Sequence, residues 1–409
     1  MQTISEPLPI KAVQGNITSP LGFYACGIHT KVKRKRNDLG LLYCDVPASA
    51  AAVYTLNQII AAPLLATKES IRKEGKLQAV IVNSGNANAC TGKQGHIDAQ
   101  EMKDAVAGRF SLASHLVAVA STGIIGERMP MDKIIPGIEC LNPEKNLDAS
   151  EAFNESILTT DTCKKSVCYE ANIDGKTITM AGSAKGSGMI APNMATMLAF
   201  ITTDAVIEPG HLQAALSKVT DQTFNRITVD GDTSTNDMVL VMASGHAENN
   251  SLTPEHPEWD VFVQLLNKVA QDLAMMIARD GEGATKLIEV KVSGAANDKE
   301  AGMIAKSVVA SDLVKTMVFG SDPNWGRVMM AIGKSGMQLN PETIDIFIGG
   351  HPLLRQSQPV DFSEEELSSY LKQEEVEIAI QLNIGSGEGK AWGCDLTYDY
   401  VRINASYRT

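Results

Sequence analysis

Two hydrophobic patterns alternate along the chain: short apolar runs typical of buried strands, and longer stretches with helical spacing. Ala79–Val82 and Leu116–Ala120 are continuous apolar runs, which predict strands covered on both faces. Small and polar residues follow each run, Asn83–Asn88 after the first and Ser121–Gly123 after the second. The residues between the two runs predict a helix at 96–110, so the pattern indicates a strand, a helix and a second strand.

A hairpin and a long helix are the clearest elements in the middle of the chain. Two alternating runs within Cys168–Ser183 flank Asp174 and Gly175, a pair that favours a tight hairpin turn. The stretch 258–279 predicts a helix that ends at Asp280-Gly281. Its apolar positions form one stripe at helical spacing. They are Phe262, Leu265, Leu266, Val269, Leu273 and Met276.

The remaining pattern continues this alternation of strands and helices. Further helices are expected at 148–158, 209–219, 298–310 and shortly after Pro323. Further strands are expected at Leu287–Val292, near 315–320, and at Ile344–Ile348, Val376–Leu382 and Asp395–Ile403. We therefore expect an α/β protein with mixed sheets and outer helices. Since no low-complexity linker interrupts the pattern, composition defines no domain boundary.

Composition and charge narrow the class of partner. The 409 residues are 44% hydrophobic and 21% charged, with a net charge of −12, which argues against nucleic acid as the main partner. The basic run Lys31–Arg36 is short and predicts a solvated loop or edge-strand face. We find no apolar window of about 18 residues and no secretory signal at Met1–Glu6. We thus expect a cytoplasmic protein with no membrane partner.

Cysteine and histidine positions give no support for a metal site. The seven cysteines are odd in number and form no CxxC pair, which indicates reduced thiols. The seven histidines are isolated from one another and from the cysteines. We therefore expect neither a metal nor a cofactor.

The segment 184–205 carries the most distinctive local composition. A loop with Gly186 and Gly188 leads into the apolar stretch Met194–Ile201, which predicts a central strand with Thr196 near its start. By spacing alone, Thr196 is an ordinary strand threonine. The loop lacks the order of a phosphate-binding P-loop, and Gly385–Gly389 lacks the helix that follows a dinucleotide-binding loop.

The run Lys185–Leu198 resembles the signature of the ornithine acetyltransferase (glutamate N-acetyltransferase) family of arginine biosynthesis. The resemblance covers nearly the whole chain. Other matching stretches are Val82–Ala89, Ser121–Gly126, Thr159–Thr162, Asp230–Asp237, Asp280–Thr285, Asp322–Arg327 and Asn404–Thr409.

The resemblance implies a protein that cuts itself before the signature threonine. The cleaved bond would be Ala195–Thr196, giving an α chain of 1–195 and a β chain of 196–409 that form the catalytic unit together. The new α-amine of Thr196 has a reference pKa of about 7.7–8, so it can act as the base for its own hydroxyl. The implied fold is a layered αββα sandwich, like that of N-terminal-nucleophile hydrolases.

The implied reaction moves an acetyl group from N2-acetyl-L-ornithine to L-glutamate through an acetyl-Thr196 ester. Thr122 and Gly123 would form the oxyanion hole. By spacing alone, Thr122 and Gly123 form an ordinary turn between a strand and a loop. By the same reasoning, Glu282 lies in the loop that ends a helix, and Thr409 belongs to a frayed terminus. The resemblance instead implies that one group of residues contacts the substrates: Thr159, Lys185, Thr196, Glu282, Asn404 and Thr409.

Two other functions remain open, as does the range of donors. β-Peptidyl aminopeptidases resemble this fold and also use a freed N-terminal nucleophile, commonly serine, so a hydrolase is the main alternative. The other is a non-enzymatic amino-acid-binding protein with an intact chain. The sequence leaves open whether acetyl-CoA also serves as donor. An α2β2 heterotetramer is implied by the resemblance alone.

Overall fold

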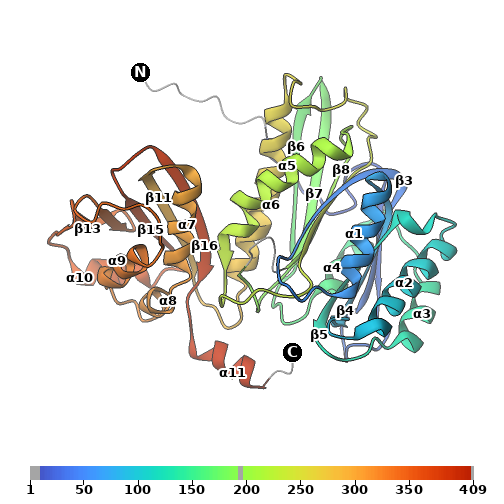
Figure 1. Ribbon diagram of the computed structural model, residues 1–409, viewed down its shortest axis with the longest axis horizontal. Helices are drawn as coiled ribbons and strands as arrows, with labels where there is room; N and C mark the ends of the chain where they lie inside the picture. Colours follow the sequence, from blue (N-terminus) through green and yellow to red (C-terminus); the bar gives the residue numbers. More distant parts are fainter. Residues whose placement is uncertain (1–9, 192–196, 407–409) are drawn as a thin grey trace.

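Two mixed β-sheets organise the chain (Figure 1). The computed structural model describes residues 10–191 and 197–406. Within these ranges the larger sheet has nine strands in the order β1-β6-β7-β8-β10-β3-β4-β5, with β2 paired to β3. The strands are β1 (Ile10–Ala12), β2 (Phe23–Ile28), β3 (Leu39–Tyr54), β4 (Lys76–Asn86), β5 (Val117–Ile124), β6 (Lys165–Ile173), β7 (Lys176–Lys185), β8 (Leu198–Thr203) and β10 (Met238–Ala243).

Several strands of this sheet match the hydrophobic pattern. The apolar runs at Ala79–Val82 and Leu116–Ala120 form β4 and β5, which pair in parallel. The predicted hairpin is β6–β7, and its turn residues Asp174 and Gly175 have φ of 55° and 71°. Positive φ at both central positions suits the right-handed twist of a hairpin. The expected strand at Met194–Ile201 is confirmed for its described part, as β8.

The large sheet folds over on itself into two layers, and β3 passes from one layer to the other. The register of β3 against β4 shifts between Tyr43 and Ala48. One face of β8 and β10, with Phe200 and Leu240, shares an apolar cluster with Val80 of β4. The opposite faces of these strands pack against helices. The layers run helix, sheet, sheet, helix, as expected for an αββα arrangement.

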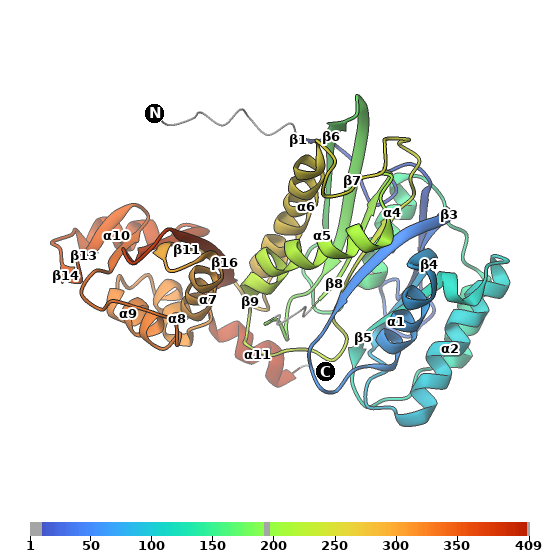
Figure 2. The ribbon, with the colours of Figure 1, turned by 45° about the horizontal axis from the view of Figure 1, so that its top comes forward.

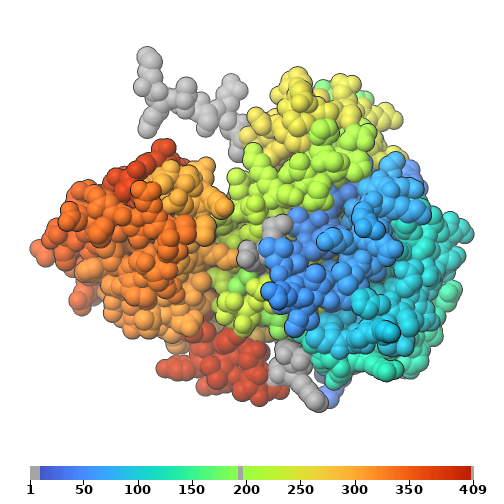
Figure 3. Space-filling model, viewed as in Figure 1, coloured from blue at the N-terminus to red at the C-terminus, as the bar shows by residue number. Residues whose placement is uncertain are grey.

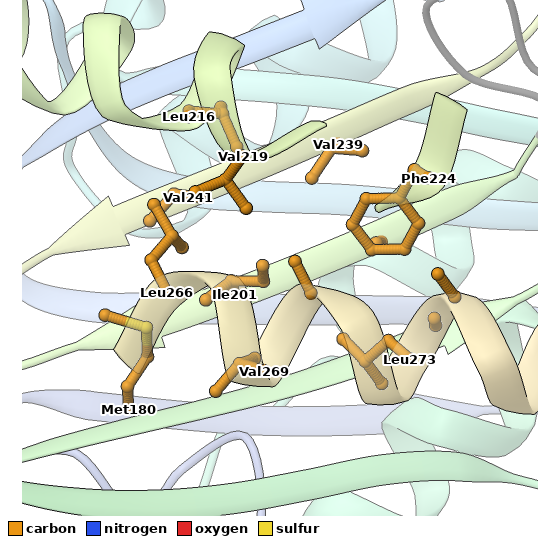
Figure 4. Packing of buried hydrophobic residues seen from close by; sticks show 14 of the residues in the cluster. Met180, Ile201, Leu216, Val219, Phe224, Val239, Val241, Leu266, Val269 and Leu273 are labelled. Carbon is orange, nitrogen blue, oxygen red and sulfur yellow. The ribbon is translucent and has the colours of Figure 1, made fainter. Parts of the chain in front are cut away.

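Helices cover both outer faces of this sandwich. α5 (Pro209–Gln222) and α6 (Trp259–Arg279) pack on β6–β8 and β10 (Figure 4). α2 (Gly92–Arg109) and α3 (Met131–Glu139) pack on β4 and β5. α1 (Ala62–Glu74) and α4 (Leu147–Ile157) add Leu64 and Phe153 to the inner cluster. Each large apolar side chain buried in this way stabilises the fold by about 1.5–3 kcal/mol.

The long helix α6 confirms the predicted apolar stripe except at Met276, which is only partly buried. Its residues Phe262, Leu266 and Leu273 are buried in the core beneath the sheet. Among the described residues, α6 alone is long and apolar enough to cross a membrane by length and composition. Since this stripe packs against β-strands and α5, α6 has the character of a core helix.

The C-terminal part forms a second lobe beside the sandwich (Figures 2 and 3). Helices cover one face of its sheet, whose order is β14-β13-β12-β15-β11-β16-β9. Its strands are β9 (Ile227–Thr228), β11 (Leu287–Ala295), β12 (Asp345–Ile348), β13 (His351–Arg355), β14 (Gln358–Pro359), β15 (Glu375–Gln381) and β16 (Gly387–Cys394). Its helices are α7 (Asp298–Val309), α8 (Asp312–Phe319), α9 (Trp325–Gly333) and α10 (Glu364–Leu371).

Two of the predicted strands are wrong. The segment near 315–320 lies in helix α8, because Val314, Met317 and Val318 have helical spacing and turn one face into the core. Asp395–Ile403 is a short loop followed by helix α11 (Tyr398–Ser406), which has no buried residue. Its alternating pattern therefore does not reflect a half-buried strand. The last strand is instead the Gly-rich β16.

The basic run Lys31–Arg36 forms a loop, as expected, but it is not fully solvated. Lys33 donates from Nζ to the Leu158 carbonyl at 2.9 Å, and Arg36 donates to the Asp161 carbonyl at 3.1 Å. Burial lowers the pKa of Lys33 to about 8. This loop therefore packs against the segment that contains Thr159.

Candidate active site

A cavity of about 280 Å³ lies in the sandwich beside the end of β7 and the start of β8. All of the predicted site residues that the structure describes line it. They are Thr122, Gly123, Thr159, Lys185, Glu282 and Asn404. Ala195, Thr196 and Thr409 lie outside the described residues. Met197, which follows Thr196 in the chain, belongs to the cavity wall.

The cavity wall at Thr122 and Gly123 is formed by the end of β5. Gly123 has φ of 135°, a conformation that side chains rarely adopt. A Cβ atom there would lie 2.4 Å from the backbone carbon of Gly85 on the neighbouring strand. Glycine is therefore the residue that lets β4 and β5 stay in contact at this point.

The buried side chain of Asn236 fixes the end of β5 by hydrogen bonds to its backbone and to the segment after β4. The Asn236 side-chain amide donates to the carbonyls of Ala87 and Ser121 at 2.5 and 2.9 Å. The Ser121 hydroxyl donates to the side chain of Asn83 at 2.5 Å. These bonds tie the residues just before Thr122 to the loop that precedes β10.

Lys185 ends β7 and is buried among charged and polar groups. Its Nζ lies 3.4 Å from the Thr122 hydroxyl oxygen. Burial lowers the pKa of Lys185, although the charge of Asp161 opposes this effect. In Asp161, burial disfavours the charge, but Lys185 and Lys165 outweigh it, so the pKa of this carboxyl is lowered. Asp161 is therefore a buried anion matched to two cations.

The second cation, Lys165, links three segments of the site. Its Nζ donates to Asp161 at 2.7 Å and to Asp280 at 2.5 Å, and both pairs are buried. Asp161 also accepts the backbone N–H groups of Thr159 and Gly186 at 3.0 and 2.7 Å. The network thus fixes three positions: the backbone of Thr159, the backbone of Gly186 beside Lys185, and Asp280 at the end of α6.

Glu282 follows α6, and its carboxylate lies against the backbone of Gly188 at the cavity wall. A Cβ atom on Gly188 would lie 2.4 Å from the Glu282 carboxylate. The Asn404 side-chain amide donates to Glu282 at 2.8 Å. Glu282 is 7% exposed, so its carboxylate is held at the wall by α11 on one side and the glycine loop on the other.

Asp230 holds the loop that leads towards residue 192. Its carboxylate accepts the backbone N–H groups of Met189 and Ile190 at 2.6 and 2.8 Å. The Tyr400 hydroxyl of α11 donates to the same carboxylate at 3.3 Å. Burial, followed by the Asp230 charge, raises the pKa of Tyr400, which keeps this hydroxyl protonated.

Sequence reasoning missed the residues that support these contacts. Asp161, Asp230, Asp237, Asn236 and Asp280 lie in stretches that the family resemblance included, but no role had been assigned to them. Lys165 and Tyr400 lie outside those stretches. A usable signal was the presence of carboxylates among small and hydroxyl-bearing residues, as in Asp230–Asp237.

The arrangement fits a small molecule that carries both kinds of charge. Lys185 supplies a cation, Glu282 supplies an anion, and the threonines of the wall supply hydroxyl groups. Among residues 10–191 and 197–406, no group of three or more His, Cys, Asp or Glu side chains is placed to hold a metal ion.

Comparison with known proteins identifies related chains. The sequence profile of the ArgJ family matches residues 24–409. The "Arginine biosynthesis bifunctional protein ArgJ" of Halalkalibacterium halodurans is 63% identical over 411 residues, covering 100% of both chains.

Two solved structures are also similar. A crystal structure of arginine biosynthesis bifunctional protein argJ from Bacillus halodurans shares 66% identity at a TM-score of 0.51, covering 52% of this chain and 100% of that one. Ornithine acetyltransferase from Mycobacterium tuberculosis, solved with ornithine, shares 36% identity at a TM-score of 0.42, covering 46% of this chain and 99% of that one. The profile match and the full-length relative together show that the chain belongs to the ArgJ family.

Proposed function

We propose that this acyltransferase of arginine biosynthesis moves the acetyl group of N2-acetyl-L-ornithine to L-glutamate, which makes it a glutamate N-acetyltransferase. The observation that carries the proposal is the shared cavity. Thr122, Gly123, Lys185 and Glu282 line it together with Met197, the residue after the proposed nucleophile. Membership of the ArgJ family supplies the metabolic context.

The proposed nucleophile is Thr196, freed by cleavage of the Ala195–Thr196 bond. The solved Bacillus halodurans chain covers 52% of this chain, and 196–409 is about 52% of the 409 residues. This agreement supports a mature protein of two chains, 1–195 and 196–409. Because β8 and β10 lie between β7 and β3, cleavage would leave both chains in one sheet.

The proposed chemistry is a ping-pong transfer. The α-amine of Thr196 takes the proton of its own hydroxyl, and Oγ attacks the acetyl carbonyl. The Thr122 hydroxyl and the Gly123 N–H stabilise the oxyanion, and one such donor lowers the barrier by about 3 kcal/mol. Ornithine then leaves with a proton on its α-nitrogen. Glutamate takes the acetyl group in the second half-reaction.

The remaining proposed roles concern substrate binding. The cation of Lys185 suits the substrate carboxylate, and the anion of Glu282 suits the side-chain ammonium of acetylornithine. Thr159 and Asn404 supply further hydrogen bonds from the same wall. Thr409 is proposed to complete this set, although it lies outside the described residues.

A second activity at the same site is favoured by the word "bifunctional" in the names of the relatives. We propose that acetyl-CoA also donates the acetyl group to glutamate, as in an amino-acid N-acetyltransferase. The hydrolase alternative has less support, because the match to the ArgJ family spans residues 24–409. A cytoplasmic α2β2 heterotetramer remains part of the proposal.

Assays with purified protein test the proposal. Glutamate should be acetylated in the presence of either N2-acetylornithine or acetyl-CoA, and acetylornithine should persist when glutamate is omitted. Thr196→Ala should abolish self-cleavage and turnover, since the hydroxyl is lost, whereas Thr196→Ser should retain part of both. Full activity in Thr196→Ala, or hydrolysis of acetylornithine without glutamate, would contradict it.

A further inference from the structure

The cation of Lys185 lies at the end of a chain of alternating charges. Asp280 contacts Lys165 at 2.5 Å, and Lys165 contacts Asp161 at 2.7 Å. Asp161 also accepts the backbone N–H of Gly186, the residue after Lys185, at 2.7 Å. From Asp280 onwards the charges are therefore negative, positive, negative and positive, and of these four side chains only that of Lys185 lines the cavity.

Burial makes the charge of Lys185 dependent on a nearby anion. The residue is 8% exposed, and the side chains of Asp161 and Lys165 are fully buried beside it. A buried ammonium group without an opposite charge tends to lose its proton. Burial lowers the pKa of Lys185, and the charge of Asp161 is the strongest influence in the opposite direction.

The other carboxyl groups near Lys185 are less suited to this role. Burial raises the pKa of Asp237 well above its usual range, so this group takes up a proton readily. Glu282 accepts a hydrogen bond from Asn404 and favours the Lys185 cation less than Asp161 does. The remaining titratable groups around Lys185 are Lys165 on β6, Asp230 and Asp232 in the loop before β10, and Tyr400 on α11.

Asp161 also fixes the backbone of the two segments that carry Thr159 and Lys185. Its Oδ1 atom accepts from Lys165 and from the Gly186 N–H, and its Oδ2 atom accepts from the Thr159 N–H at 3.0 Å. A carboxylate with three donors is held in one orientation. The spacing between Thr159 and Lys185 is thus set by a side chain that does not itself line the cavity.

We propose that Asp161 is a positioning residue for substrate binding, which keeps the ammonium group of Lys185 charged and in place to receive the carboxylate of an amino acid. The inference rests on the proposed function, in which Lys185 binds the substrate carboxylate. Asp161 acts through Lys185, and Lys165 and Asp280 hold Asp161 from the opposite side. The site therefore selects amino acids over amines of the same length that lack the carboxylate.

Calorimetric titration of the purified protein with L-ornithine and with putrescine, which is ornithine without its carboxylate, tests the proposal. Wild type should bind ornithine more tightly, because only ornithine can pair with the Lys185 cation. In Asp161→Asn this preference should fall by about tenfold or more, as expected when a charge-assisted hydrogen bond is lost. Asp280→Asn is the matched control. It also removes a buried carboxylate from Lys165 but leaves Asp161 beside Lys185, so its preference should stay near that of wild type.

The pH dependence of ornithine binding separates the charge effect from a structural one. Affinity should fall as the pH rises through the pKa of Lys185, since only the cation binds the carboxylate. Asp161→Asn removes the charge that raises this pKa, so the fall should begin at lower pH. Lys165→Gln removes a charge that lowers it, so the fall should begin at higher pH, which also decides the question if Asp161→Asn does not fold. The ligand titrates identically in every experiment, so differences between the profiles come from the protein.

The outcomes distinguish the inference from the proposed function. If wild type prefers ornithine and Asp161→Asn keeps both that preference and the wild-type pH profile, the role of Asp161 is overturned while the acyltransferase proposal stands. Equal losses of preference in Asp161→Asn and Asp280→Asn also overturn it, because they would show a general loosening of the network. A wild type that binds putrescine as tightly as ornithine overturns the assignment of Lys185 on which the inference rests, and the acetyl-transfer assay tests the reaction separately.

Discussion

The two sheets of the protein differ in how they treat their charged residues. In the sandwich, Asp161, Lys165 and Asp280 are buried and fully hydrogen-bonded beside the cavity. On the open face of the second sheet, Lys291 pairs with Glu377 at 2.5 Å, and both side chains are more than one-third exposed. Buried ions are costly unless each has partners, so the first group indicates a site fixed in advance, whereas the second has the character of a solvated surface.

The largest effect on stability is expected at the centre of the buried network. Lys165→Met keeps the length of the side chain but leaves Asp161 and Asp280 without their shared cation. The free energy of unfolding should fall by about 3–5 kcal/mol, as when one partner of a buried ion pair is removed. Denaturant unfolding measures it. A loss below 1 kcal/mol would mean that the buried ion pairs of Lys165 contribute no more to stability than an exposed pair does.

A slightly smaller effect is expected at Thr122 and Gly123, the proposed oxyanion hole. Gly123→Ala forces a Cβ atom against Gly85 and displaces the strand end, so kcat should fall about 10²–10³-fold. Gly126→Ala is the control, because Gly126 also has positive φ, at 83°, but a Cβ atom there meets nothing within 4 Å. Equal losses of kcat in both variants would mean that backbone strain, rather than displacement of the turn, explains the effect.

The pH dependence of stability sharpens the comparison further. The pKa of Asp161 is lowered in the folded state by Lys185 and Lys165 against the effect of burial. Its contribution is therefore present above the unfolded pKa of about 3.9 and is lost as the pH falls through the folded pKa. Asp161→Asn should make the acid limb of the stability profile less steep than in wild type. If the unfolding free energy of Asp161→Asn fell as steeply with decreasing pH as that of wild type, the prediction would be contradicted.

The smallest effect is expected on the open sheet face. Lys291→Met removes the exposed pair with Glu377, and exposed pairs stabilise a protein by about 0–1 kcal/mol. Unfolding free energy should change within that range, and acetyl transfer should match wild type. A loss comparable to that of Lys165→Met would remove the distinction between the two sheets.

How well an element could be predicted from the sequence depended on whether its apolar residues had one clear periodicity. Elements with one clear periodicity were predicted well: β4 and β5 as continuous apolar runs, and α6 as a helical stripe. α8 was mistaken for a strand because its β-branched residues outweighed their helical spacing. α11 was mistaken because its alternation arises on an exposed segment that touches the body through a few polar contacts.

The site shows the same limit. The family resemblance named Thr122, Lys185 and Glu282, and the structure brings these residues to one cavity. The partners of those residues could not be predicted, because local sequence does not encode contacts between distant segments. Lys165 and Asp280 are 115 positions apart.

N-terminal sequencing and intact-mass measurement of the purified, active protein show directly whether the Ala195–Thr196 bond is cut. We expect two chains, one starting at Met1 and the other reading Thr196-Met197-Leu198, with masses that sum to the 43.8 kDa chain plus one water. A fully active protein that yields only the Met1 terminus and a single 43.8 kDa mass would contradict it.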